Sequence, residues 1–75
     1  MPESIRVAIE VVAGVIPGKH IPEYTKRFII TSDVWNKPEE ARQEILKTYG
    51  YAQEYARDLM NPKILNWVKL EWIYL

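Results

Sequence analysis

Glycine, lysine and histidine come close together in one stretch of this chain, between positions 14 and 20. The stretch is Gly14-Val15-Ile16-Pro17-Gly18-Lys19-His20. A phosphate-binding P-loop needs four residues between its glycines and a Ser or Thr after the lysine, whereas three residues separate the glycines here and a histidine follows. Pro22 leaves no room for the helix whose N-terminus would bind phosphate. The stretch therefore predicts a turn between two strands rather than a phosphate site.

His20 is the only histidine, and the chain has no cysteine. Disulfide scaffolds, thiol redox centres and zinc-thiolate sites are thereby excluded. A metal site would need carboxylates such as Glu23 and Asp33 to converge on His20, and residues three apart on a strand point to opposite faces. No Ser-His-Asp or Cys-His arrangement can be assembled. We therefore predict no catalytic residue, metal ligand or cofactor. A small enzyme or ligand carrier that uses His20, Glu23 and Tyr24 is the least favoured hypothesis.

Aromatic and basic side chains also occur together in the segments with strand character. Tryptophan flanked by arginine and lysine on a sheet face can stack the bases of single-stranded nucleic acid. Lys+Arg and Asp+Glu are both 10, however, and domains built mainly to bind nucleic acid usually carry a basic surplus. Nucleic-acid binding is therefore the alternative function. Its site would consist of Arg6, Arg27, Trp67 and Lys69.

Two strands must flank the turn and position these side chains. Apolar residues alternate with more polar ones over residues 5–11, which predicts a strand with one buried face. The Ile16–Lys19 segment suits a type II turn, after which a second strand would run to about Thr31. If the ends of this turn pair, the numbers of paired residues sum to 35. Because type II turns suit tight hairpins less well than primed turns, the loop could be wider, and Gly14 could mark a bulge.

A helix and a third strand follow. Asn36 is the predicted N-cap, with a proline in the first turn, and Asn61-Pro62 is the predicted stop. Small and apolar residues between them recur every three or four positions, which predicts one buried stripe. The stripe consists of Ala41, Ile45, Tyr49, Ala52, Ala56 and Leu59. Alternation over residues 64–75 predicts the last strand.

The order of these elements is β-β-α-β, which we interpret as one small α+β domain over residues 1–75. Pro22 falls in the second predicted strand, and proline is tolerated at a sheet edge. The third strand then pairs with the first, giving a three-stranded antiparallel sheet of order 2-1-3 with one long helix on one face. No apolar run approaches the roughly 20 residues of a membrane span. We expect no membrane association, and the lack of cysteine fits a cytoplasmic protein.

One helix covers only one face of such a sheet, so apolar residues on the other face remain uncovered. The chain is 48% hydrophobic, and exposed apolar surface of this extent usually marks a contact surface. We therefore predict a non-enzymatic interaction or regulatory module that forms a homodimer, with another protein as a further partner. The predicted interface residues are Val15, Ile16 and Ile21 at an exposed hairpin tip, together with Ile29, Trp67, Ile73 and Leu75.

Overall fold

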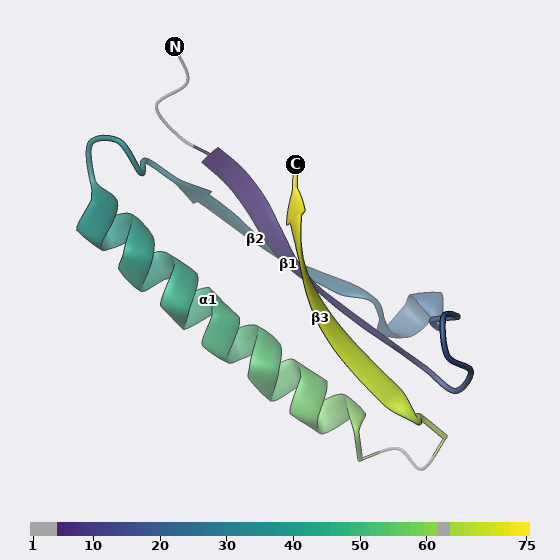
Figure 1. Cartoon of the computed structure of the whole chain (residues 1–75). Coiled ribbons are helices and arrows are strands. Elements are labelled where there is room, and N and C mark those ends of the chain that lie inside the picture. The colour runs from purple at the N-terminus through teal and green to yellow at the C-terminus, as the bar shows by residue number, and fades with distance from the viewer. Residues whose placement is uncertain (1–4, 62–63) are drawn as a thin grey trace.

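Over the residues that the structure describes, the fold consists of one antiparallel sheet and one α-helix (Figure 1). The computed structural model describes residues 5–61 and 64–75. The sheet has the order β2-β1-β3, and both neighbours of β1 are antiparallel to it. The α+β fold and the strand order predicted from the sequence are thereby confirmed. The elements are β1 (Ile5–Gly14), β2 (Lys26–Ser32), α1 (Pro38–Leu59) and β3 (Trp67–Tyr74).

The predicted hairpin register is wrong by two residues. Val7 pairs with Ile30, so the numbers of paired residues sum to 37 instead of 35. An even shift leaves every side chain on its predicted face, because alternation along a strand has a period of two. The pairing of β1 with β3 is continuous up to Gly14 opposite Trp67. The described strands therefore contain no bulge at Gly14.

The loop between β1 and β2 is longer than a tight hairpin. Its type II turn is confirmed, because the Lys19 N–H donates to the Ile16 carbonyl oxygen over 3.0 Å and Gly18 has a φ of 79°. The chain then forms a short 3-10 helix, Pro22–Tyr24, before β2 begins. The prediction that Pro22 lies in the second strand is therefore wrong, although β2 does lie at a sheet edge. The backbone twist of a type II turn does not match that of a two-residue hairpin, which accounts for the longer loop.

Helix α1 begins one residue later than predicted. Lys37 is its N-cap. Asn36 lies in the preceding turn, where its backbone N–H donates to Oδ1 of Asp33 over 3.0 Å. The Asn36 side chain donates to Oδ2 of the same carboxylate over 3.2 Å. Because its side chain is engaged there, Asn36 does not cap the helix.

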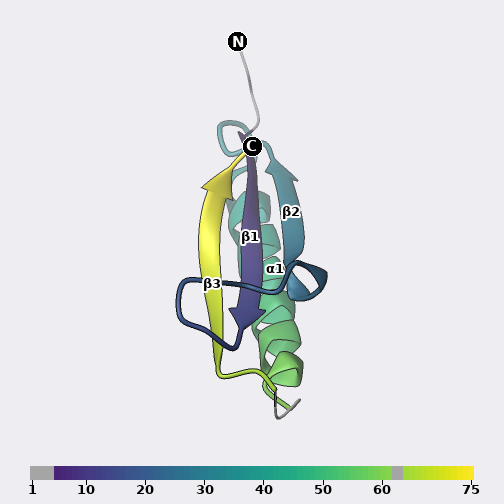
Figure 2. The ribbon, with the colours of Figure 1, turned by 90° about the vertical axis from the view of Figure 1, so that its right-hand side faces the viewer.

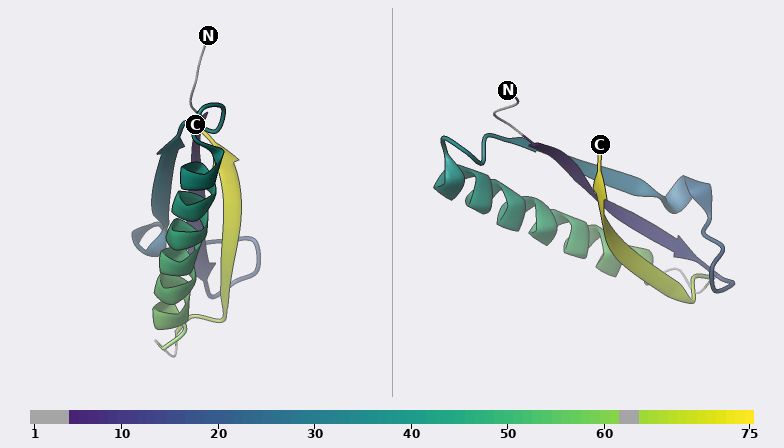
Figure 3. Two further views of the ribbon diagram at one scale, coloured as in Figure 1. Left: turned by 90° about the vertical axis from the view of Figure 1, so that its left-hand side faces the viewer. Right: turned by 45° about the horizontal axis from the view of Figure 1, so that its top comes forward.

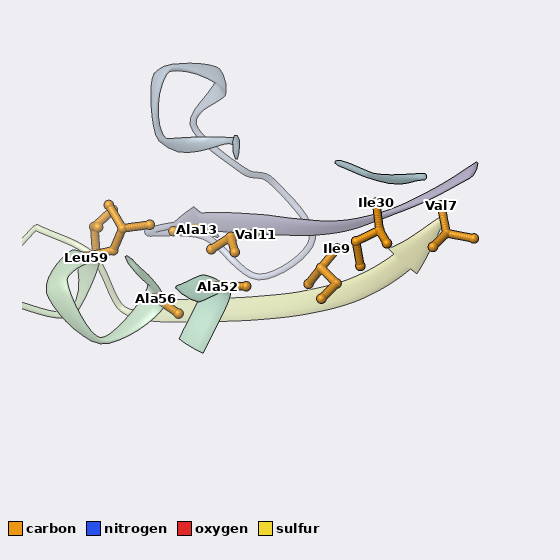
Figure 4. Close-up of a cluster of buried hydrophobic side chains, with 9 residues drawn as sticks. Val7, Ile9, Val11, Ala13, Ile30, Ala52, Ala56 and Leu59 are labelled. Atoms are coloured by element: carbon orange, nitrogen blue, oxygen red, sulfur yellow. The ribbon is translucent and has the colours of Figure 1, made fainter. Parts of the chain in front are cut away.

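The predicted helical stripe packs on the sheet and contributes to the core, and Figure 4 shows its residues Ala52, Ala56 and Leu59 within the buried cluster. All of its residues are buried or packed against the core cluster. Alanine side chains let the helix lie close to the sheet, so the core is thin. The largest fully buried side chains are those of Ile9, Ile30 and Val11. The helix ends at Leu59, and Pro62, part of the predicted stop, lies outside the described residues.

The molecule is thin and elongated because it has only two layers. Its extents are 45 × 21 × 15 Å and its radius of gyration is 14.3 Å, compared with about 11 Å for a compact chain of this length. Helix α1 runs along the sheet in front of β1, between β2 and β3 (Figure 3). Among the described elements, no α-helix packs on the opposite face (Figure 2), which we call the open face. Within the described ranges, no helix has both the length and the apolar character needed to cross a membrane.

Candidate interaction surface

Every second residue of the three strands contributes to the open face. The β1 side chains that point to α1, such as Ile9 and Val11, belong to the core, so their neighbours along the strand point to the open face. Strand pairing arranges these neighbours in rows that cross the sheet, with β1 in the middle. The residues that β1 contributes are Arg6, Ala8, Glu10 and Val12.

One row across the open face is entirely apolar, and we call it the apolar row. It consists of Ile29 on β2, Ala8 on β1 and Ile73 on β3, which lie side by side. Ala8 is 0% exposed because its larger neighbours cover it, whereas Ile29 is 52% exposed. Leu75 continues the alternation beyond Ile73, and its N–H donates to the Arg6 carbonyl oxygen over 3.1 Å. This end of the open face therefore presents uncovered apolar surface.

The next row is charged, and its charges are paired within the sheet. Arg27 lies opposite Glu10, and its Nε donates to Oε2 of Glu10 over 2.8 Å. On β3, Lys69 forms an ion pair with Glu71. The neighbouring carboxylates therefore neutralise Arg27 and Lys69. No ion pair of Arg6 is found in the part of the chain that the structure describes.

The β1–β2 loop folds back over one end of the open face. In Figure 2 its dark blue segment crosses in front of β3 and β1. The indole Nε1 of Trp67 donates to the Ile16 carbonyl oxygen over 2.8 Å. Asn66 Nδ2 donates to the Val15 carbonyl oxygen over 3.2 Å. The predicted exposed hairpin tip therefore does not protrude, because donors at the start of β3 hold the loop against the sheet, although Val15 and Ile16 stay exposed.

Gly14 marks the place where the loop crosses β1. A Cβ at this position would overlap the carbonyl oxygen of Lys19 and would lie 3.1 Å from Cζ2 of Trp67 and 3.2 Å from Cα of His20. Only glycine leaves enough space for two backbone segments to approach this closely. The loop can therefore cover this end of the open face only because residue 14 is a glycine. The sequence pattern had placed this glycine in a turn or a bulge.

An open groove remains between the loop and the sheet. Its volume is about 480 Å³, and both His20 and Glu10 line it. Glu23 and Tyr24 do not line this groove, and Tyr24 packs against the core instead. The groove therefore does not bring together the residues of the enzyme hypothesis. Among residues 5–61 and 64–75, no three His, Asp or Glu side chains lie close enough together to hold a metal ion.

The residues predicted to form an interface fall into two groups. The group at the uncovered end consists of Ile29, Ile73 and Leu75. The other group lies at the loop. There Val15 and Ile16 are 41% and 58% exposed, whereas Ile21 is half-buried against the core and Trp67 is half-buried. Only the first group forms a continuous apolar surface on the sheet.

Two aromatic residues on the α1 side of β3 are exposed although they lie on the face that the helix packs against. Trp72 stacks on Tyr49 with ring centroids 6.2 Å apart, yet it is 51% exposed, and Tyr74 is 88% exposed. A helix about 10 Å across cannot cover a three-stranded sheet roughly 14 Å wide. Helix width was the signal that could have identified this uncovered edge from the sequence.

No protein-family model, no curated protein and no solved structure matches this chain. Its function is therefore argued from the surface described above. That surface combines an apolar row, a charged row whose charges are paired, and a loop that covers one end. Of these features, the apolar row is the one that a folded chain most needs to cover.

Proposed function

We propose that this chain is a non-enzymatic interaction module that binds a second copy of itself through the uncovered part of the open face. The apolar row carries this proposal. Ile29 is 52% exposed in the single chain, although apolar residues of a sheet face are normally covered by a second layer of structure. A second copy supplies the missing layer.

The exposed area of the chain also fits a dimer. The solvent-accessible surface is 5641 Å², whereas a compact monomer of this mass exposes about 4,800 Å². The excess of roughly 800 Å² equals the area that one partner contributes to a standard protein interface. Two-fold dimers are the commonest assemblies of identical chains. A second copy is therefore the occupant that these areas favour.

The geometry of the open face favours nucleic-acid binding less than it favours a dimer. Arg27 and Lys69 are paired with glutamates, and Trp67 uses its indole N–H to hold the loop. Nucleic-acid binding, a second protein partner and a cytoplasmic location therefore stay predictions. Tryptophan fluorescence titrated with a single-stranded oligonucleotide at low salt tests the first of these, because stacked bases quench exposed indole rings.

Replacing one exposed residue of the apolar row tests the dimer. We expect the wild-type chain to sediment with twice the 8.9 kDa mass of one chain. We expect Ile29→Asp to sediment as a monomer, because a carboxylate buried in an apolar interface loses its water without gaining a partner. Sedimentation velocity over a range of concentrations measures both masses.

Leu46→Asp is the matched control. Leu46 is 60% exposed on α1, away from the open face, so the same substitution there should leave the dimer intact. Circular dichroism establishes that both variants fold. Two results would contradict the proposal: a wild-type chain that stays monomeric at high concentration, or a Leu46→Asp variant that dissociates as readily as Ile29→Asp.

A further inference from the structure

The position of the loop restricts how two open faces can meet. The loop crosses one end of β1 (Figure 2). Val12 lines the groove beneath the loop, and a Cβ at Gly14 would overlap the Lys19 carbonyl oxygen, whereas Ala8 of the apolar row does not line that groove. If two sheets stacked with parallel β1 strands, both loops would lie at the same end and would prevent the normal sheet spacing of about 10 Å. With antiparallel β1 strands, each loop lies beyond the end of the other sheet.

We infer that two copies stack face to face with antiparallel β1 strands. The two-fold axis lies between the two sheets and runs parallel to the apolar row. The inference rests on the proposed function and specifies its contact. The axis brings Ile29, Ala8 and Ile73 of one copy against the same row of the second copy. Identical apolar rows are complementary to each other, as a two-fold interface requires.

The same axis aligns opposite charges on the two central strands. Arg6 lies two residues before Ala8 and Glu10 two residues after it, at roughly 7 Å to either side. The two-fold rotation therefore places Arg6 of each copy over Glu10 of the other. A crossing angle of about 30° between stacked sheets displaces these positions by only ~3.5 Å, which an arginine side chain spans. Arg27 bonds to Oε2 of Glu10, which leaves the second carboxylate oxygen as an acceptor for the arginine of the other copy.

The edge strands are compatible with this axis. Register positions on β2 place Thr31 of one copy over Arg27 of the other. On β3 they place Leu75 over Glu71, whose charge is already paired within its own sheet. Like charges do not meet at these positions. An axis through the charged row would instead set glutamates against glutamates and would drive each loop into the other sheet.

Two charge-reversed forms of the full chain test the contact. Arg6→Glu puts two glutamates at each contact. Glu10→Arg combined with Arg27→Glu puts two arginines there, while the ion pair within the sheet is kept with its sign reversed. We expect each form alone to dimerise at least about tenfold more weakly than the wild-type chain, because like charges meet twice. In an equimolar mixture, both contacts of the heterodimer are again between opposite charges, and we expect affinity close to that of the wild type.

Native mass spectrometry separates the heterodimer from both homodimers by mass, and sedimentation velocity gives the affinities. A heterodimer that forms with affinity close to that of the wild type supports the antiparallel stack. If the double variant fails to fold by circular dichroism, Glu10→Gln takes its place, and its mixture with Arg6→Glu should still form more heterodimer than Arg6→Glu forms homodimer.

The outcomes separate this inference from the function on which it rests. Variants that dimerise as tightly as the wild type, or a mixture without recovery, overturn the stacking but leave self-association standing. Pairing of sheet edges would produce that result, because Arg6 and Glu10 are then remote from the contact. A wild-type chain that stays monomeric overturns both.

Discussion

Gly14 and Gly50 differ in the space that a side chain would find at each position. At Gly14 the backbone of the loop lies against the strand, and a Cβ would overlap the carbonyl oxygen of Lys19. Gly50 lies on the exposed side of α1, where nothing is found within 4 Å of a Cβ. Glycine in a helix interior lowers stability because it gains the most conformational freedom on unfolding. Substitutions at the two positions should therefore change stability in opposite directions.

Alanine at the two positions tests this contrast. We expect Gly14→Ala to destabilise the chain by about 1–3 kcal/mol, because the loop must shift away from the strand. We expect Gly50→Ala to stabilise it by about 0.5–1 kcal/mol. Urea unfolding followed by circular dichroism measures both changes. Equal effects at the two positions would contradict the close crossing at Gly14.

Among the connections between elements, the turn from β2 to α1 depends on the charge of Asp33. The Asn36 N–H donates to this carboxylate over 3.0 Å and holds the pKa of Asp33 below its ordinary value, although partial desolvation opposes the effect. The Asn36 side chain and the positive charge of Lys37 act in the same direction as the main hydrogen bond. Because the folded pKa is the lower one, ionised Asp33 stabilises the fold above the unfolded pKa of about 3.9. That stabilisation is lost as the pH falls through the folded value.

Asp33→Asn removes the titrating charge and keeps an acceptor for the turn. We expect the wild type to melt at a higher temperature than Asp33→Asn at about pH 6, and the difference to shrink as the pH falls below about 4. Thermal unfolding at several pH values between these limits and about pH 2 measures it. Glu54→Gln, at an exposed position of α1, controls for the loss of one carboxylate. A difference for Asp33→Asn that does not change with pH would contradict the role of the charge.

The sequence predicted which face of its strand or helix each residue occupies. It did not predict the register, that is, which residues of neighbouring strands lie opposite each other. Alternation has a period of two, so registers that sum to 35 and to 37 put the same residues on the open face. Membership of the open face could therefore be predicted, with Ile29 and Ile73 named. The apolar row itself could not, because a sum of 35 pairs Ala8 with Arg27 instead of Ile29. The path of the loop could not, because Trp67 and Asn66 bond to loop carbonyls 51 residues away. Local turn preferences contain no information about such distant donors.

At the scale of the whole molecule, the chain has little interior for its length. Its largest fully buried side chains are those of Ile9, Ile30 and Val11, and the helix covers only one side of the sheet (Figure 3). Chains of this size bury roughly 60–65% of their unfolded surface, so a single copy is only modestly stable. Covering the open face in a dimer would add apolar burial that the single chain lacks. Folding and association should then be coupled.

Thermal stability should therefore depend on protein concentration. We expect the melting temperature of the wild-type chain to rise by roughly 3–6 °C for each tenfold increase in concentration, because mass action favours the folded dimer over two unfolded chains. Ile29→Asp should melt at a lower temperature that does not change with concentration, since this variant lacks the contact. Differential scanning calorimetry over a hundredfold range measures both. A constant melting temperature for the wild type would mean that a second copy does not cover the apolar row, and its occupant would then have to be a different partner.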